Sequence, residues 1–395
     1  MVSWRFVEPL DVLFLRGNRL FGEAGSYGES LVPPWPSAVA GALRARMLVD
    51  RHPGWAPARQ AALPEDPELG TPEAPGAFTV AAFHLARRGT DGHVEPVLPM
   101  PADLVVTGRA DGAPEILAMR PRRLAEGIGS SFPEGLPKRP VLAQPRRAKP
   151  ASGWWLTAAG WKRYLAGGVP AGEGELVHAR ELWLHDERVG VGLDADTRRA
   201  SDGRLFTVQA VAMRLLPGDG GRHAGATGFL VGVEGAEPPR EGLLRLGGDG
   251  RAAVLRALEG FTMPEPDWDA VAASRRCRLV LTAPGIFEAG WLPPGAAPAD
   301  GAVRFELHGV RGRIVCAAVP RYQVVSGWDL ARWEPKAAER AVAPGAVYWL
   351  ELDEGVGPDD LRRLAARGLW TEAEHARNPR RAEGFNRVAV AAWGG

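Results

Sequence analysis

Short strand-like segments dominate the periodic parts of this chain of 395 residues. Only three segments read as helices: one from Ser37, with Val39, Leu43 and Met47 on one face, and shorter ones at 154–166 and 359–367. Strands interrupted by so few helices predict an α+β fold, because a doubly wound parallel fold alternates strands with helices. Alternating or continuous apolar runs predict the strands, at 1–15, 78–85, 115–119, 177–193, 205–216, 229–233, 276–281, 303–308, 313–319, 346–352 and 387–393.

The length of the chain is comfortable for two domains. We predict a boundary near residue 260, after RAAVLRALEGFT and before PEPDW, which gives domains 1–260 and 261–395. Both halves begin with a predicted strand. Residues 52–77 and 120–153 are rich in proline and lack periodicity, so they predict loops inserted into the first domain.

Several protein classes are disfavoured by the composition. Cys277 and Cys316 are too few for a disulfide scaffold or a four-thiolate zinc site, and their apolar neighbours predict buried thiols. No apolar stretch reaches 18 residues, so we expect no membrane span. The first residues lack the basic and apolar pattern of a secretory leader, which makes the cytoplasm the expected location.

The common catalytic motifs are missing from the sequence. There is no GxxxxGK[ST], HExxH, CxxC or GxSxG pattern, and the eight histidines are scattered. The aspartates at 194 and 196 are better explained by loop geometry than by acid–base chemistry. We therefore expect no catalytic residue, no bound metal and no cofactor.

A basic window interrupts the otherwise balanced charge of +1. No acidic residue occurs between Gly135 and Gly172. Cations interleaved with aromatic rings suit a single-stranded nucleic acid, whose phosphates need charge and whose bases stack. A solvated basic face above core aromatics is the other interpretation. The window contains Lys138, Arg139, Arg146, Arg147, Lys149, Lys162 and Arg163 together with Trp154, Trp155, Trp161 and Tyr164.

A glycine-dotted loop precedes the first predicted helix. A helix N-terminus after such a loop is a favourable anion site, because its free N–H groups point outward. We predict that Gly22, Gly25, Gly28 and the N-cap Ser37 approach a phosphate and that Arg44 adds charge. Simple capping by Ser37 with an exposed Arg44 is the alternative. A second candidate contact comprises Trp328, Arg332, Trp333 and Lys336, where the tryptophans could equally be core residues.

A charged finger lies between two predicted strands. The segment DADTRRASDGR, 194–204, carries three arginines and three aspartates, far more than a short hairpin loop of two to five residues needs. The strand after it, 205–216, is apolar on both faces, which predicts a strand covered on two sides.

Four ordered stretches resemble one known family. They are PLDVLFLRGNRLFG with PPWPSAVAGALR (9–44), KPASGWWLTAAGWKRYLAGG (149–168), ERVGVGLDADTRRASDGRLFTVQAVAMRL (187–215) and VVSGWDLARWEPKAAERAVAPGAVYWLEL (324–352). Together they are similar to the third subunit of the Cmr complex, a repeat-associated (RAMP) protein of type III-B CRISPR effectors. The resemblance implies two ferredoxin-like (RRM-like) domains with loop insertions and a thumb-like β-hairpin.

The resemblance also implies a non-catalytic role in a ribonucleoprotein. Such subunits hold the 5′ repeat-derived tag of the guide (CRISPR) RNA, meet target RNA only indirectly, and contact the large polymerase-like subunit and the first backbone RNase subunit. One copy is expected in each hetero-oligomer. Thr197, Arg198 and Arg199 would then lie near the tag-to-guide junction. The sequence departs from the family at Asn386, where a glycine of the C-terminal glycine-rich loop is expected.

Two alternatives remain on sequence grounds. One is a metal-independent RAMP endoribonuclease that processes precursor guide RNA, with His178 or His185 acting with Lys162 or Tyr164. The other is the equivalent subunit of a type III-A (Csm) complex. The first would yield a 2′,3′-cyclic phosphate product in EDTA.

Overall fold

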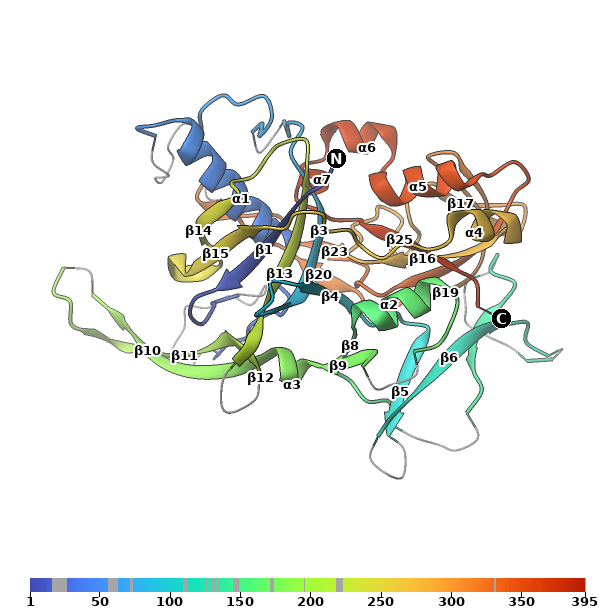
Figure 1. Ribbon diagram of the computed structural model, residues 1–395, viewed down its shortest axis with the longest axis horizontal. Coiled ribbons are helices and arrows are strands. Elements are labelled where there is room, and N and C mark those ends of the chain that lie inside the picture. Colours follow the sequence, from blue (N-terminus) through green and yellow to red (C-terminus); the bar gives the residue numbers. More distant parts are fainter. Residues whose placement is uncertain are drawn as a thin grey trace.

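Two large antiparallel sheets form the centre of the protein in the computed structural model (Figure 1). The mixed α/β architecture agrees with the predicted α+β class. The structure describes residues 1–15, 27–55, 63–71, 74–108, 113–125, 127–128, 133, 135–144, 149–170, 174–194, 196–217, 223–329 and 332–394.

The first sheet is built from residues that precede the predicted boundary near 260. Its neighbouring strands pair antiparallel throughout. In spatial order it contains β14 (Glu241–Arg245), β15 (Ala252–Ala257), β1 (Ser3–Pro9), β13 (His223–Glu234), β3 (Thr79–Gly89), β4 (Val94–Pro99), β8 (Trp154–Leu156) and β9 (Leu176–His178), and β12 (Leu215–Pro217) pairs with β13.

The second sheet is built from residues after that boundary, and it too is antiparallel. The strands predicted from alternation at 276–281, 303–308, 313–319, 346–352 and 387–393 all belong to it, which confirms those predictions within a few residues. In spatial order it contains β17 (Ala296–Ala299), β18 (Ala302–Leu307), β19 (Val310–Ala318), β24 (Val347–Leu352), β16 (Arg276–Leu281) and β25 (Val388–Ala392).

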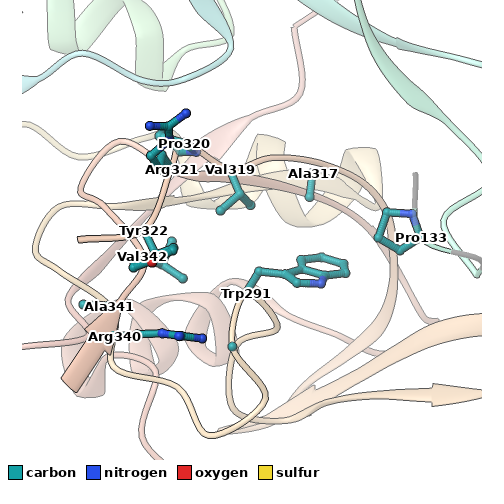
Figure 2. A pocket seen from close by; sticks show the side chains of 11 residues that line it. Pro133, Trp291, Ala317, Val319, Pro320, Arg321, Tyr322, Arg340, Ala341 and Val342 are labelled. Atoms are coloured by element: carbon teal, nitrogen blue, oxygen red, sulfur yellow. The ribbon is translucent and has the colours of Figure 1, made fainter. Parts of the chain in front are cut away.

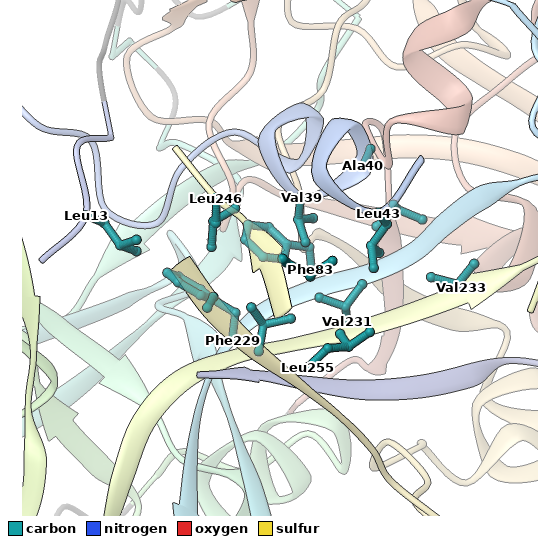
Figure 3. Close-up of a cluster of buried hydrophobic side chains, with 14 of the residues drawn as sticks. Leu13, Val39, Ala40, Leu43, Phe83, Phe229, Val231, Val233, Leu246 and Leu255 are labelled. Atoms are coloured by element: carbon teal, nitrogen blue, oxygen red, sulfur yellow. The ribbon is translucent and has the colours of Figure 1, made fainter. Parts of the chain in front are cut away.

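Helix α1 (Pro36–Arg51) covers one face of the first sheet (Figure 3). Val39, Leu43 and Met47 are buried against Phe83 and Phe229, as their spacing predicts. Each such side chain stabilises the fold by about 1.5–3 kcal/mol when fully buried. The predicted N-cap was wrong, since the helix begins one residue before Ser37.

Trp35 is the N-cap residue of α1, and no side-chain hydrogen bond caps the helix. Pro36 occupies the first helical position, where the missing N–H costs nothing and the fixed φ of proline suits the helix. Ser37 therefore lies within the first turn. In the sequence, Pro36 and not Ser37 marks the start of this helix.

The remaining helices are short. Thr157 caps α2, where its Oγ1 accepts from Gly160 N at 3.3 Å, so the predicted helix at 154–166 starts late and its first residues form β8. The helix predicted at 359–367 is confirmed as α5, with Gly368 at its C-cap at φ 74°. These helices are α2 (Ala158–Leu165), α3 (Ala179–Leu182), α4 (Trp268–Ser274), α5 (Pro358–Arg367), α6 (Glu372–Arg377) and α7 (Pro379–Ala382), and a 3₁₀ turn covers Gly248–Gly250.

Both faces of the second sheet are covered, by different parts of the chain. Helices α4 and α5 pack on one face. Helix α2, which precedes residue 260, packs on the other through Trp161 and Tyr164. A buried ion pair spans this contact, with Arg278 Nη1 donating to Asp103 Oδ2 at 2.7 Å. The first part of the chain is therefore packed against the second sheet through a shared core.

A long hairpin projects from the body of the molecule (Figure 1). Its strands β10 (Trp183–Leu193) and β11 (Ala200–Met213) pair antiparallel, and β2 (Tyr27–Gly28) adds a short parallel pairing. The predicted strand at 177–193 is thus divided into β9, α3 and β10. Small sheets complete the fold: β5 (Leu104–Gly108) with β6 (Pro114–Arg122) and β7 (Arg139–Leu142), β20 (Gln323–Val325) with β23 (Glu339–Ala341), and β21 (Trp328–Asp329) with β22 (Glu334–Pro335).

The prediction that 205–216 is covered on two sides was wrong for most of the segment. Ala210 and Val211 are buried near the base of the hairpin, where Val211 bridges to Leu13. Leu205, nearer the tip, is 60% exposed. The apolar pattern reflects a projecting hairpin and not a central strand.

Candidate RNA-binding surface

Two of the resembling stretches, far apart in the sequence, meet beside the N-terminus of α1. Trp35 packs against a buried group that includes Val325 of β20 and Phe385. We call this group the junction cluster, and it consists of Trp35, Ile286, Val325, Ala341, Trp370 and Phe385. The cluster brings the first stretch, 9–44, into contact with the fourth, 324–352.

The segment that carries Phe385 also contains buried arginines. Arg387 donates from Nε to Val80 O at 3.2 Å and from Nη1 to Ala366 O at 2.8 Å. Burial lowers its pKa to about 10, against the opposing effect of Glu234. Arg381 donates to Gly76 O at 3.1 Å, and burial lowers its pKa as well. Carbonyl oxygens carry only partial charge, so they do not cancel these cations.

Arg44 was predicted to add charge beside a phosphate, but its side chain is partly buried against the protein. It donates from Nη2 to Gly70 O at 3.1 Å, and burial lowers its pKa. Its Nε–H and that of Arg381 are buried without an acceptor among the described residues. Sequence reasoning missed Arg381 and Arg387, although the segment PRRAEGFNR carries three arginines directly before an apolar strand.

Lys336 ties the fourth stretch to the C-terminal segment. Its Nζ pairs with Glu383, which also accepts from Arg380 Nη1 at 3.0 Å. Glu383 therefore neutralises part of the local positive charge. Lys336 was predicted as an RNA contact, and here it forms an internal ion pair.

Trp328 and Trp333 lie at the surface of the protein and are not core residues. Trp328 is 49% exposed and Trp333 is 43% exposed. Their rings meet edge-on, with centroids 6.0 Å apart. Arg332 lies between them in the chain, and its N–H donates to Asp329 Oδ1 at 3.1 Å, which closes the turn. Two half-exposed rings on one short hairpin form a surface on which a base can stack.

The tip of the β10–β11 hairpin is a preformed turn. Asp194 Oδ1 accepts from Thr197 N and from Thr197 Oγ1, both at 2.8 Å. These hydrogen bonds lower the pKa of Asp194. The expectation that Asp194 shapes the loop is confirmed. Thr197, Arg198 and Arg199 are exposed, and Arg198 has φ 54°.

One face of this hairpin is an apolar ridge, formed by Val189, Val191, Leu193 and Leu205, which are 43–70% exposed. On the opposite face, a Cβ at Gly190 would lie 2.4 Å from the ring of Phe206. Glycine is needed there because the ring crosses the partner strand. Large exposed apolar groups on a projecting hairpin are typical of a contact surface.

The basic window does not form one surface. Trp161 and Tyr164 are buried core residues, so the stacking interpretation is wrong for them. Lys138 pairs with Glu351 at 2.9 Å and Arg139 donates to Leu136 O, while Lys149 and Lys162 are exposed. For these residues, the other interpretation of the window, a solvated basic face above core aromatics, fits better.

Gly28 is the one predicted loop glycine that the structure describes, and it pairs with Val208 of β11. Gly22 and Gly25 lie outside the described residues, as do Arg146 and Arg147. Asn386 is buried and has a backbone φ of 58°. Its Oδ1 accepts from Ile286 N at 2.7 Å, and its Nδ2 donates to Leu369 O at 2.9 Å. Asn386 therefore connects two backbone segments inside the protein.

Two residues of the ribonuclease alternative, Tyr164 and His178, make other hydrogen bonds inside the protein. The Tyr164 hydroxyl is buried and donates to Asp103 Oδ1 at 2.8 Å, and burial raises its pKa well above the usual range. His178 caps α3, accepting from Arg180 N at 3.2 Å. Within the described residues, no group of three or more His, Cys, Asp or Glu side chains could hold a metal ion.

Burial raises the pKa of Cys277 and of Cys316 to about 12. Both thiols are buried, which confirms that prediction. No helix in the described parts of the chain is long and apolar enough to cross a bilayer.

The described residues thus form two antiparallel sheets, a projecting hairpin and a half-exposed tryptophan pair. A family model with the description "CRISPR-associated protein (Cas_Cmr3)" matches residues 5–393. The chain therefore belongs to the Cas_Cmr3 family, the third subunit of the type III-B Cmr complex. This assignment overturns the Csm alternative.

Solved structures with some similarity are cryo-EM structures of type III-B Cmr-beta. A chain of the complex bound to cognate target RNA has 12% identity and a TM-score of 0.44, with 98% of this chain and 96% of that chain covered. A chain of the complex bound to cognate target RNA and AMPPnP, state 1, has 13% identity and a TM-score of 0.42, with 88% and 86% covered. No curated protein matches the chain.

Proposed function

We propose that this protein is a non-catalytic subunit that binds the 5′ repeat-derived tag of the guide RNA in a cytoplasmic type III-B ribonucleoprotein. In one copy, it bridges the large polymerase-like subunit to the first backbone RNase subunit. The observation that carries the proposal is the junction cluster. In it, Trp35 at the N-terminus of α1 packs against a buried group that contains Val325, close in sequence to the exposed Trp328, and Phe385, close in sequence to the buried Arg387.

We propose further that each large sheet is a ferredoxin-like domain, 1–260 and 261–395. In that βαββαβ fold the first strand lies between the last and the third. The order β15-β1-β13-β3 follows this pattern, as does β25-β16-β24-β19. Each unit keeps one of the two crossover helices, α1 in the first and α5 in the second. This arrangement supports a fold shared with RNA-recognition modules.

The hairpin β10–β11 has the form of a thumb. We assign its tip, Thr197 to Arg199, to the boundary between tag and guide, and its apolar ridge to contact with bases or neighbouring subunits. The exposed tip arginines and the exposed ridge support this assignment. Target RNA is met only through the guide.

A binding titration tests the proposed function. The full chain, alone and assembled with its two neighbouring subunits, is titrated with guide RNA that carries or lacks the tag. Preference for tagged RNA is expected, and the double variant W328A/W333A should remove it. Arg240→Ala is the control, because Arg240 is exposed and already paired with Glu259 at 2.5 Å. Equal affinity for tagged and untagged RNA in both forms would reject the proposal.

A further inference from the structure

A cavity of about 490 Å³ lies at the base of the β20–β23 ladder and shares only Ala341 with the junction cluster (Figure 2). Tyr322 directly precedes β20, and Arg340 and Ala341 belong to β23. The volume is within the range of about 300–1,000 Å³ that small-molecule sites occupy. The cavity is therefore large enough for one nucleotide.

The inside of the cavity is apolar and aromatic. The indole of Trp291 lies across it, toward Ala317 and Pro133, with Val319 and Val342 nearby (Figure 2). The backbone at Trp291 is fixed, because its carbonyl accepts from the hydroxyl of the buried Tyr348 at 2.6 Å. A flat ring entering the cavity would meet a preformed aromatic surface.

The rim of the cavity is cationic. Arg340 lies over the ring of Tyr322, with its guanidinium carbon 5.1 Å from the ring centroid. Tyr322 is 54% exposed, and Arg321 beside it is exposed as well. Among the described residues that line the cavity, two are arginines and none is acidic. Such a rim complements a phosphate at the mouth of an aromatic site.

We propose that this cavity binds one base of the guide RNA, turned out of the strand, with its ring against Trp291 or Tyr322 and its phosphate at Arg340 and Arg321. The proposal rests on the proposed function, since it needs an RNA strand at this surface. Tyr322 and Trp328 are six residues apart along one hairpin, so a single strand stacked on Trp328 continues naturally toward the cavity. An apolar side chain of a partner protein would fill the cavity without using the two arginines.

A series of guide RNAs with one 2-aminopurine each tests the proposal in the assembled complex. One tag position is expected to be quenched by aromatic stacking. Tyr322→Ala should restore fluorescence at that position alone and weaken binding roughly tenfold, the usual loss for one stacked base. Tyr322→Phe keeps the ring and should leave both values unchanged. Arg340→Ala should weaken binding more at low salt than at high salt.

Three different outcomes would overturn the cavity proposal. If RNA binds with tag preference but neither Tyr322→Ala nor Trp291→Ala changes any position, the cavity is not a base site and the proposed function stands. If Tyr322→Ala weakens assembly with partner subunits in the absence of RNA, the cavity holds a protein side chain and the proposal is overturned. If no tag preference exists, both the cavity proposal and the proposed function fail.

Discussion

The junction cluster and the β10–β11 hairpin are held in place in opposite ways. At the junction, Trp370 and Phe385 are completely buried, and Arg387 is fixed by two carbonyls. On the hairpin, Val189 is 70% exposed and Leu205 is 60% exposed. One region is organised by the rest of the chain, whereas the other presents its side chains to solvent.

This difference suggests a division of roles within the proposed RNA-binding surface. A two-stranded hairpin has little stability of its own, so β10–β11 depends on its base, where Leu13 and Val211 pair. Its outer half carries exposed apolar side chains that a partner would cover. The junction, in contrast, is preformed, which lowers the ordering cost of binding. We therefore expect the junction to determine affinity for the tag and the hairpin to respond to assembly.

The largest effect should come from emptying the junction. Phe385→Ala is expected to lower the free energy of unfolding by about 3–5 kcal/mol, because a fully buried ring is replaced by a cavity. Leu205→Ala on the hairpin is the matched control and should change it by less than about 0.5 kcal/mol. Urea denaturation of the full chain measures both. Equal losses at the two sites would remove the contrast between the regions.

The next largest effect should come from low pH, which is expected to destabilise the buried interior and not the exposed hairpin. Burial lowers the pKa of His84 on β3 to about 4, so the unfolded chain binds the proton more readily. Stability from this group is complete above about pH 6.5 and falls as the pH drops toward 4, by up to roughly 3 kcal/mol. His84→Leu should flatten the pH profile of the unfolding free energy. Leu205→Ala, on the exposed hairpin, removes no titratable group and should leave the profile as it is.

Removing one stacking ring should have an intermediate effect, on binding alone. Trp328→Ala is expected to weaken RNA binding by about 1–3 kcal/mol with little change in stability, since the ring is half exposed. Trp328→Phe should recover most of the loss. Fluorescence anisotropy with tagged RNA measures both variants. A large drop in melting temperature would instead identify Trp328 as a packing residue.

The smallest effect should come from the tip of the hairpin. Replacing both Arg198 and Arg199 with Ala should weaken guide binding modestly, without unfolding the protein, because both side chains are exposed. The slope of log affinity against log salt should fall by roughly 1.4 if each arginine contacts one phosphate of a single strand. A salt series identical to that of the parent protein would mean that the tip is only a loop.

Local patterns predicted the local structure well. The alternation at 276–281 gives β16 with the same bounds, and the helix ended by Gly368 is α5. The exposed tip of the hairpin also follows from its charged sequence. These features depend on neighbours along the chain, which a single sequence displays.

Features that depend on distant contacts were missed. Tyr164 was grouped with stacking residues, but it packs beside Arg278, whose partner Asp103 is 175 residues away in sequence. The buried arginines at 381 and 387 are likewise supported by carbonyls of β3 and of the segment just before it. Neither arrangement has a local signature, because a charged residue in a sequence looks the same whether it is solvated or buried.

Photo-crosslinking of the assembled complex tests the central claim most directly. Guide RNA carries 4-thiouridine at single positions across the tag and the first guide nucleotides, and crosslinked peptides are identified by mass spectrometry. We predict that tag positions crosslink to peptides containing Trp328 or Trp333, and that the tag–guide boundary crosslinks to the hairpin tip at 197–199. Tag crosslinks found only on other subunits would contradict the account.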